Sequence, residues 1–579
     1  MVSRKGPRKR SKRSETGGEE DRPRRPHNLR ESLFSFKGRD FISPDDFTKE
    51  ELEYLVETGI RVKKDWNDPA KVDDRQSRLK GKRAYFLFRE PSSRTFTSSQ
   101  TASLLQGAEV CQMIGEEANS FAKGEPWRDW FEQLGRDHGF NYYVVRTKQE
   151  GAPRFASQVL RRLSEKLGRP HAPVVNGGDG RHWHPTQGSL DHQFAYTVFC
   201  PEGHWNGMNA RTICYGGDLA NSRTVHTNMR NWMRYPSVRF VFVAIEGMRM
   251  PRDYLSMLDA KEITYKEVDC FDRSLLSTVD NVYLARPQKE RWEKGLTPAQ
   301  KQDYARAITL RKSYLPFHPR SSPCGRYSLP IVFHALPRDK AFPEMDEDLI
   351  DSPFWGGYDE SNEGIYNRAG LFNLITGVPG FGDELPVRAE KKGEAGKTIF
   401  EVEEGILKTR SNDQVGPITA GYVLDHISDD TDLFRGILGM LPHPMGRTSN
   451  ARVVSNKRST HSKTGWKYIA KIEEPGLEEI GDDHLPSMAT PALPKELAER
   501  IALMDPEIVI NIIKSGVVKY KMHAVIPNLV VGRISCVNEA CISHPLQMEH
   551  APSEFYIENK RAGLYRCGFC DTVADARSL

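Results

Sequence analysis

Residues 84–95 read Ala-Tyr-Phe-Leu-Phe-Arg-Glu-Pro-Ser-Ser-Arg-Thr, a short apolar run that ends in a polar turn. The apolar part has the length of a buried strand, and the serines that follow favour the start of a helix. Similar apolar runs, most of them followed by a polar segment and a helix-like stretch, lie at 173–175, 212–215, 238–244, 282–285 and 329–333. This alternation predicts an α/β fold with parallel sheets and crossover helices.

The turn after Phe88 carries groups that suit a phosphate. A helix that begins at Ser92-Ser93-Arg94-Thr95 leaves backbone N–H groups free, and the hydroxyls and the Arg94 guanidinium add further donors. An ordinary Ser/Thr helix cap would also explain the two serines. The motif alone leaves both interpretations open.

Polar and cationic residues follow several other predicted strands. They are Arg146, the segment 179–187 (Asp-Gly-Arg-His-Trp-His-Pro-Thr-Gln) with His184 and Gln187, Arg223, Arg286 with Gln288, and 334–338 (His-Ala-Leu-Pro-Arg). Ligands of parallel sheets bind beyond the carboxyl ends of the strands, where these turns lie. The arginines there predict substrates with several negative charges. HExxH, nucleophile-elbow and P-loop lysine motifs are missing, so metal hydrolysis, acyl-enzyme chemistry and ATP hydrolysis lack support.

The 579 residues are too many for one core and predict about three to five domains. The net charge is +5, and residues 1–30 alone contain eleven Lys or Arg and four Asp or Glu, a local balance of +7. This basic tail is expected to be disordered. It is either an arm for nucleic acid or an acidic partner, or a solvated extension, and we favour the extension. No apolar run has the length of a membrane span and no secretory signal is visible, so a cytoplasmic protein is expected.

Four of the nine cysteines cluster near the C-terminus as Cys536-x4-Cys541 and Cys567-x2-Cys570, with 25 residues between the pairs. Four thiolates suit one tetrahedral structural zinc ion per chain and leave no open position for catalysis. Disulfides are the alternative, which a reducing compartment disfavours. Near the other end, Ser43 as a cap and Pro44 at the first helical position predict a helix over 44–63.

Five motifs, 88–95, 179–187, 217–226, 285–291 and 334–338, together resemble the aspartate carbamoyltransferase family in content and order. The resemblance covers most of 36–378. It implies transfer of a carbamoyl group from carbamoyl phosphate to L-aspartate, a step of pyrimidine biosynthesis. It also implies two parallel-sheet domains and a final helix, 364–376, that packs back on the first domain.

The resemblance assigns a role to each matching residue. The phosphate would be held by Ser92, Ser93, Arg94 and Thr95. The carbamoyl carbonyl would be polarised by Thr95, Arg146 and His184, with Gln187 close by. The two carboxylates of aspartate would bind Arg223, Arg286 and Gln288, and the carbamoyl amide would meet the backbone of Leu336 and Pro337. Lys123 matches a loop lysine that reaches a neighbouring subunit, which implies catalytic trimers, and Ser120 is the candidate serine before it, with Asn119 competing.

The C-terminal part resembles the regulatory chain of the same family, through 420–427 and 536–544. The resemblance implies a fusion of catalytic and regulatory chains, an α+β domain that binds nucleotide effectors such as ATP and CTP, and a zinc domain that docks on the catalytic part. The effector contacts would be Asp425, His426, Lys471 and Lys521, with Lys519 a possible substitute. A solvated face explains the lysines equally well, and neither the response to nucleotides nor its direction can be predicted.

The expected division is a basic tail (1–35), a carbamoyl-phosphate-binding domain (36–178), an aspartate-binding domain (179–379), a linker (380–414), an effector-binding domain (415–520) and a zinc-binding domain (521–579). Two other functions remain as alternatives. Ornithine carbamoyltransferases share the phosphate motif, but they do not lead us to expect Arg-Pro-Gln-Lys-Glu-Arg at 286–291 and usually have cysteine in place of Ala335. The second alternative is a catalytically silent zinc scaffold or a nucleic-acid binder.

Overall fold

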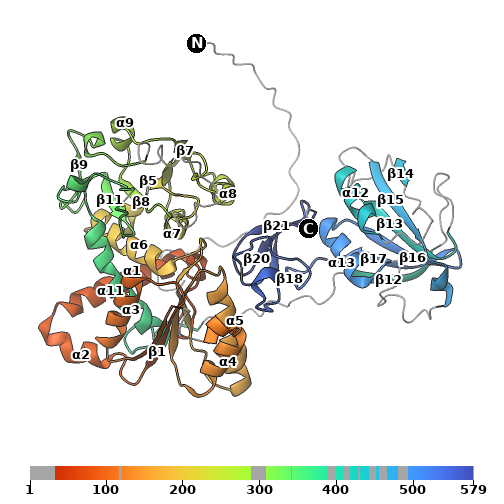
Figure 1. Ribbon diagram of the computed structural model, residues 1–579, viewed down its shortest axis with the longest axis horizontal. Coiled ribbons are helices and arrows are strands. Elements are labelled where there is room, and N and C mark those ends of the chain that lie inside the picture. The colour runs from red at the N-terminus through yellow and green to blue at the C-terminus, as the bar shows by residue number, and fades with distance from the viewer. Residues whose placement is uncertain are drawn as a thin grey trace, which may run out of the picture.

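The computed structural model describes residues 33–115, 120–288, 308–340, 342–387, 400–407, 418–427, 431–441, 452–455, 466–479 and 493–577. Figure 1 shows a large α/β part, a small β module beside it, and a further sheet with its helices beyond the module. Among the described residues, no helix combines the length and apolar character that crossing a membrane requires.

The first domain of the predicted catalytic part is a four-stranded sheet in the order β2-β1-β3-β4, and all its pairings are parallel. Its strands are β1 (Arg83–Phe88), β2 (Glu109–Ile114), β3 (Tyr142–Thr147) and β4 (Val174–Asp179). Its helices are α3 (Ser93–Leu104), α4 (Trp127–Asp137) and α5 (Ala152–Leu167). Because the strands are parallel, the turns after Phe88, Thr147 and Asp179 lie at one edge of the sheet.

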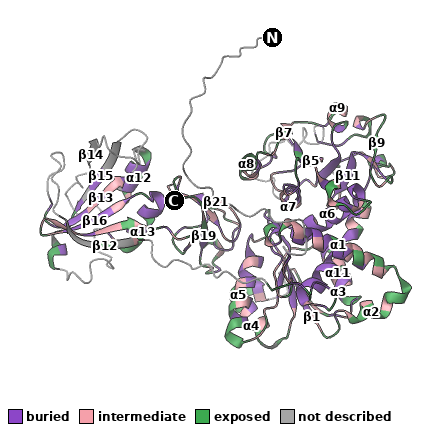
Figure 2. Ribbon diagram, turned by 180° about the vertical axis from the view of Figure 1, so that it is seen from behind, coloured by how far each residue is buried: buried purple, intermediate pink, exposed green. Residues whose placement is uncertain are grey.

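The second domain of the predicted catalytic part has a five-stranded sheet in the order β11-β8-β5-β6-β7, also fully parallel. Its strands are β5 (Thr212–Gly217), β6 (Arg239–Val243), β7 (Tyr265–Val268), β8 (Asn281–Ala285) and β11 (Ile331–His334). Its helices are α6 (Pro185–Phe199), α7 (Arg223–Trp232), α8 (Arg252–Ala260) and α9 (Arg273–Leu276). The prediction of an α/β part with two parallel-sheet domains is confirmed. In Figure 2 buried residues run through both sheets and along α6 and α11.

Helix α11 (Gly357–Thr376) packs against α1 (Lys49–Trp66), α3 and α6, so the last helix of the catalytic part lies on the first domain. The crossing with α1 is close: a Cβ on Gly370 would lie 3.1 Å from the Gly59 nitrogen. At the far end of α3, the Asn373 amide donates to Gln106 at 2.9 Å. These contacts join the two domains into one body around the turns at the strand ends.

The predicted helix over 44–63 is divided in the structure. Ser43 caps only a short 3-10 turn, η2 (Pro44–Asp46), and the long helix α1 begins after Thr48, which forms a second capping box with Glu51. The backbone of Phe47 is extended, with φ −114° and ψ 139°, so it interrupts the helix. Thr48 then starts α1 through the hydroxyl and carboxylate of its own capping box.

The sheet of the predicted regulatory part, called the regulatory sheet below, is antiparallel, in the order β12-β17-β16-β13-β15-β14. Its strands are β12 (Phe400–Leu407), β13 (Gly421–Ile427), β14 (Arg452–Ser455), β15 (Trp466–Glu473), β16 (Val509–Lys514) and β17 (Val517–Ala524), with helices α12 (Thr431–Met440) and α13 (Lys495–Met504). This matches the predicted α+β unit. Two boundaries differ: the predicted linker 380–414 contains β12, and the predicted boundary at 520 lies inside β17. The glutamates of β12 suit an edge strand, and the same charges look like a linker in the sequence.

The small module is a second antiparallel sheet of β18 (Leu529–Val531), β19 (Glu554–Asn559), β20 (Leu564–Cys567) and β21 (Val573–Asp575). It lies between the catalytic part and the regulatory sheet (Figure 1). On one side the Tyr565 hydroxyl donates to the Leu503 carbonyl of α13 at 2.9 Å. On the other, Glu150 exchanges backbone hydrogen bonds with Ala540 and Ile542 at 2.8 and 2.9 Å. The module therefore connects the two larger parts.

Candidate active site

A cavity of about 600 Å³ lies where the carboxyl ends of both parallel sheets meet. It is lined by nearly all the predicted substrate residues, namely Ser92, Ser93, Arg94, Thr95, Arg146, His184, Gln187, Arg223, Arg286, Gln288, Leu336 and Pro337. Ser120 and Lys123 do not line it. They belong to the 3-10 turn η4 (Ser120–Lys123), where the Ser120 hydroxyl bonds to the Glu125 carboxylate and Lys123 is exposed.

The N-terminus of α3 faces this cavity. Ser92 is its N-cap residue, but its side chain makes no capping hydrogen bond. The first N–H groups of a helix have no acceptor within the helix, and the dipole there favours an anion. Of the two interpretations of this motif, the arrangement favours an anion receptor over a simple cap.

His184 lies buried at the start of α6. Its Nδ1 accepts the Gln187 backbone N–H at 3.3 Å, and its Nε2 lies 3.3 Å from the Thr95 hydroxyl. Since a backbone N–H can only donate, the ring proton is assigned to Nε2, on the Thr95 side. Burial, reinforced by the positive charges of Arg146 and Arg223, holds the pKa of His184 well below its usual value. The imidazole is therefore neutral and offers one N–H donor beside the cavity.

Glu90, which the sequence interpretation did not select, joins two of the arginines. Its carboxylate lies 3.5 Å from Arg146 and 2.8 Å from Arg223. Both guanidinium groups crowd Gly178, whose φ is +117°, and a Cβ there would lie 3.0 Å from each. Its place inside the 88–95 motif is the sequence signal that could have indicated it.

The second domain contributes the turn after β8 and the turn after β11. The Gln288 amide donates to the Asn221 carbonyl at 2.6 Å, and its backbone N–H donates to Asp218 at 3.2 Å. After β11, the Leu336 N–H donates to His334 Nδ1 at 2.7 Å. These bonds hold both turns at the rim of the cavity, with Arg286 beside them.

The segment between Asp179 and His184 is held by the small module. The two ring nitrogens of His182 lie 3.0 Å from Asp179 and 2.8 Å from Asp571, and the Trp183 indole donates to Asp571 at 2.8 Å. Burial disfavours the charged ring, but the two carboxylates outweigh it and raise the pKa of His182 to about 10. A charged His182 thus bridges the catalytic turn and the module.

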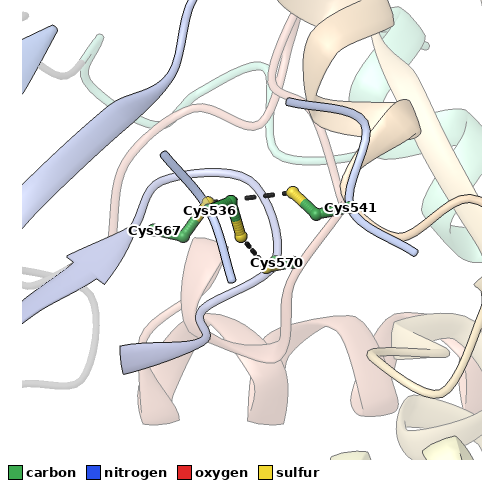
Figure 3. A group of neighbouring side chains, drawn as sticks. All are labelled: Cys536, Cys541, Cys567 and Cys570. Carbon is green, nitrogen blue, oxygen red and sulfur yellow. Dashed lines mark hydrogen bonds between the residues drawn. The ribbon is translucent and has the colours of Figure 1, made fainter. Parts of the chain in front are cut away.

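Asp571 directly follows the cysteine cluster. Cys536, Cys541, Cys567 and Cys570 are all buried, and their sulfur atoms lie within 4.8 Å of one another (Figure 3). The Cys536–Cys570 and Cys541–Cys567 sulfur pairs are 3.6 and 3.8 Å apart. These separations are far longer than a disulfide and close to the ~3.8 Å edge of a tetrahedron with metal–sulfur bonds of about 2.3 Å. The donor set therefore fits a closed four-thiolate metal site.

Comparisons with known proteins agree with this geometry. Residues 39–196 match the protein-family model described as aspartate/ornithine carbamoyltransferase, carbamoyl-P binding domain. Residues 528–579 match the family model described as aspartate carbamoyltransferase regulatory chain, metal binding domain. The aspartate carbamoyltransferase catalytic subunit of Methanosarcina mazei is 30% identical over 346 residues, which are 60% of this chain and 99% of that protein. The chain belongs to the aspartate carbamoyltransferase family.

Protein PyrBI of Treponema denticola is 28% identical to this aspartate carbamoyltransferase over 556 residues, 93% of this chain and 97% of its own. A solved structure, the catalytic subunit of M. jannaschii aspartate transcarbamoylase, is 27% identical and covers 58% of this chain and 97% of its own, with a TM-score of 0.48. The predicted family, the predicted enzyme class and the fusion of catalytic and regulatory chains are confirmed. The ornithine enzyme and the silent scaffold are set aside.

Proposed function

We propose that the cavity brings carbamoyl phosphate and L-aspartate together and transfers the carbamoyl group to the aspartate amino group. The products are N-carbamoyl-L-aspartate and phosphate. The observation that carries this proposal is a neutral, buried His184 N–H placed between a free helix N-terminus and several arginines. Such an arrangement suits two anions and a carbonyl that becomes negative during the reaction.

Carbamoyl phosphate binds with its phosphate at the N-terminus of α3, where Ser92, Ser93, Arg94 and Thr95 supply donors. Its carbonyl oxygen faces Thr95, Arg146 and the Nε2–H of His184. The neutral aspartate amine attacks the carbonyl carbon, a C–N bond forms, and the bond from that carbon to the phosphate oxygen breaks. Preorganised donors at the developing oxyanion are worth about 3–4 kcal/mol each.

Aspartate binds on the side of the second domain. Arg223, Arg286 and Gln288 line that side and grip its two carboxylates. Glu90 partly neutralises Arg146 and Arg223. Holding both substrates in line supplies the proximity on which a reaction without a covalent intermediate depends.

Lys123 and Ser120 complete the site of a neighbouring subunit in a trimer. This assignment is supported by their place in η4, outside the lining of their own cavity, and by the exposure of Lys123. The cysteine cluster holds one structural zinc ion, since thiolates in a closed tetrahedral set favour zinc. The ion supplies folding energy to the module and takes no part in the transfer.

The regulatory sheet binds a nucleotide on one face. Val423 lies opposite residue 471 on β15 and opposite Asn511 on β16, and Asn511 lies opposite Lys521 on β17. Directly paired residues share a face, and Asp425 is two residues beyond Val423. The register thus places Asp425, residue 471 and Lys521 on one face, an arrangement that suits an anionic ligand. His426, with φ of +61°, follows at the end of the strand.

Steady-state kinetics of the purified full-length chain test the central proposal. Carbamoyl phosphate is supplied with aspartate or with ornithine, with and without ATP and CTP. We expect carbamoyl transfer with aspartate only. Turnover of ornithine at a comparable kcat/KM, or no turnover of either, would reject the assignment, and an effect of nucleotides on KM for aspartate would support the regulatory face.

A further inference from the structure

Two carboxyl groups that line no part of the cavity lie directly behind it. Asp191 on α6 and Glu360 on α11 are both fully buried, with 0% exposure, and their side chains hydrogen-bond to each other. A hydrogen bond between two carboxyl groups requires a proton on one of them. Glu360 Oε1 has no donor among the described residues, whereas its Oε2 accepts the His334 N–H at 2.9 Å. The proton is therefore assigned to Glu360 Oε1, on the side of Asp191.

The electrostatics agree with one shared proton. Burial, together with the charge of Asp191, raises the pKa of Glu360 well above its usual value. Burial also raises the pKa of Asp191 to about 6, although hydrogen bonds from Glu360 and Gln187 oppose this. Two neighbouring carboxylates cannot both ionise cheaply in such a place. The pair therefore carries one negative charge as long as Glu360 keeps its proton.

Each member of the pair holds one rim segment of the cavity. Asp191 accepts the Gln187 amide at 2.7 Å and the Asn228 amide at 3.1 Å. Because a carboxylate only accepts, the Gln187 Nε2 must face Asp191, which leaves Gln187 Oε1 for the cavity. Glu360 holds the His334 backbone, and the His334 ring in turn accepts the Leu336 N–H.

We propose that the Asp191–Glu360 pair, joined by one proton, is a positioning device that sets Gln187 and the Leu336 segment so that their oxygen atoms accept the amino group of the carbamoyl substrate. The inference rests on the proposed function. It adds to it a reason why the site selects a carbamoyl group, whose –NH₂ donates two hydrogen bonds, over an acetyl group, whose methyl donates none.

The groups that face the pair determine its response to pH. They are Tyr215 on β5, Tyr283 on β8, His334 on β11 and Arg368 on α11. Arg368 is the cation whose charge reaches Asp191, and it also donates to Ser98 at 2.9 Å. One cation balances one carboxylate. Raising the pH until Glu360 ionises creates a second charge, breaks the shared bond and releases both segments.

Two substitutions of Glu360 separate the loss of its hydrogen bonds from the loss of its ability to ionise. Glu360→Leu removes the bonds to Asp191 and to the His334 N–H, and we expect KM for carbamoyl phosphate to rise about tenfold, as for loss of one well-placed hydrogen bond. Inhibition by acetyl phosphate, which has no –NH₂, should change little. Glu360→Gln keeps a donor toward Asp191 and an acceptor for His334, so it should restore KM toward wild type and abolish the rise of KM at alkaline pH.

The protonation of the pair is measured without turnover. The infrared difference spectrum between wild type and Glu360→Gln at neutral pH should contain the C=O band of a buried carboxylic acid. Absence of that band, or an alkaline rise of KM that survives in Glu360→Gln, or equal weakening of acetyl phosphate and carbamoyl phosphate by Glu360→Leu, would overturn the proposal. Failure of the proposed function would give a different result: the wild-type protein would have the infrared band but would not carbamoylate aspartate.

Discussion

The catalytic part and the regulatory sheet collect their proposed site residues in different ways. In the catalytic part, parallel strands bring turns that are up to about 250 residues apart, from Ser92 to Pro337, to one edge and one cavity. In the regulatory sheet, Asp425 and Lys521 share a face only through the antiparallel register of three strands. In the catalytic part, a motif at a strand end therefore indicates by itself where its residues lie. In the regulatory sheet, the strand pairing must be known before residues can be assigned to one face.

The small module contacts both the catalytic part and the regulatory part. It binds the catalytic turn through Asp571 and α13 through Tyr565. A change in the module can thus reach the cavity through His182 and Trp183, which immediately precede His184. Experiments that act separately on the module, on the cavity and on the regulatory face test this difference between the two parts.

Metal removal should have the largest effect. A strong chelator is expected to release one zinc ion per chain and unfold the module, since structural zinc contributes on the order of 10 kcal/mol. Metal analysis with hydrogen exchange along 528–577 measures this. The parallel-sheet domains, which have their own cores, should keep their protection. An intact module without metal would refute the zinc site.

His184→Ala should have the next largest effect. Loss of the Nε2–H donor is expected to lower kcat by about 100- to 1000-fold, because one donor to the oxyanion is lost. His204→Ala, at an exposed histidine with no side-chain capping bond, is the matched control and should keep wild-type kcat. A near-normal kcat for His184→Ala would show that another group polarises the carbonyl.

Asp571→Ala tests the connection between module and catalytic turn. The change leaves His182 Nε2 and the Trp183 indole without their acceptor, so we expect a loss of about 1–3 kcal/mol in stability. Thermal unfolding and hydrogen exchange of 179–184 measure it. Glu539→Ala, an exposed position on the same module, serves as the control. If both variants behave alike, Asp571 does not hold the turn.

The buried carboxyl pair predicts a pH dependence of stability. Because the folded state raises both pKa values, it holds protons that the unfolded chain loses near pH 4 to 4.5. Stability should therefore fall as the pH rises from that value, through about 6 and beyond. Glu360→Gln cannot ionise and should flatten this fall. Denaturant unfolding of both proteins between pH 5 and about 9 tests the sign, and parallel curves would contradict it.

Substitution on the regulatory face should have the smallest effect. Lys521→Ala is expected to weaken nucleotide binding a few-fold, since one partly exposed charge contributes about 1 kcal/mol or less. Isothermal titration with ATP and CTP measures it, while kcat without nucleotide should not change. Lys495→Ala, at the first position of α13, is the control. Equal binding by both variants would remove Lys521 from the effector site.

Much of the cavity could be predicted from the sequence. The apolar runs and the polar turns after them indicate parallel strands, and cations at several strand ends indicate one anionic site, because the topology of a parallel sheet brings those ends together. The cysteine spacing indicates a metal site in the same direct way. In these cases residue type and spacing along the chain are enough to predict the site.

Other features depend on contacts between distant segments. They involve polar residues whose sequence context suggests exposure to solvent. These residues are Glu90, the glutamates of β12, Asp571, and the proposed pair of Asp191 and Glu360. Only the tertiary structure brings these residues beside their partners. The sequence by itself determined the sheets, the converging cations and the thiol cluster, since these follow from local pattern. The folded chain alone decided which charges neutralise one another, since that depends on burial and on distance in space.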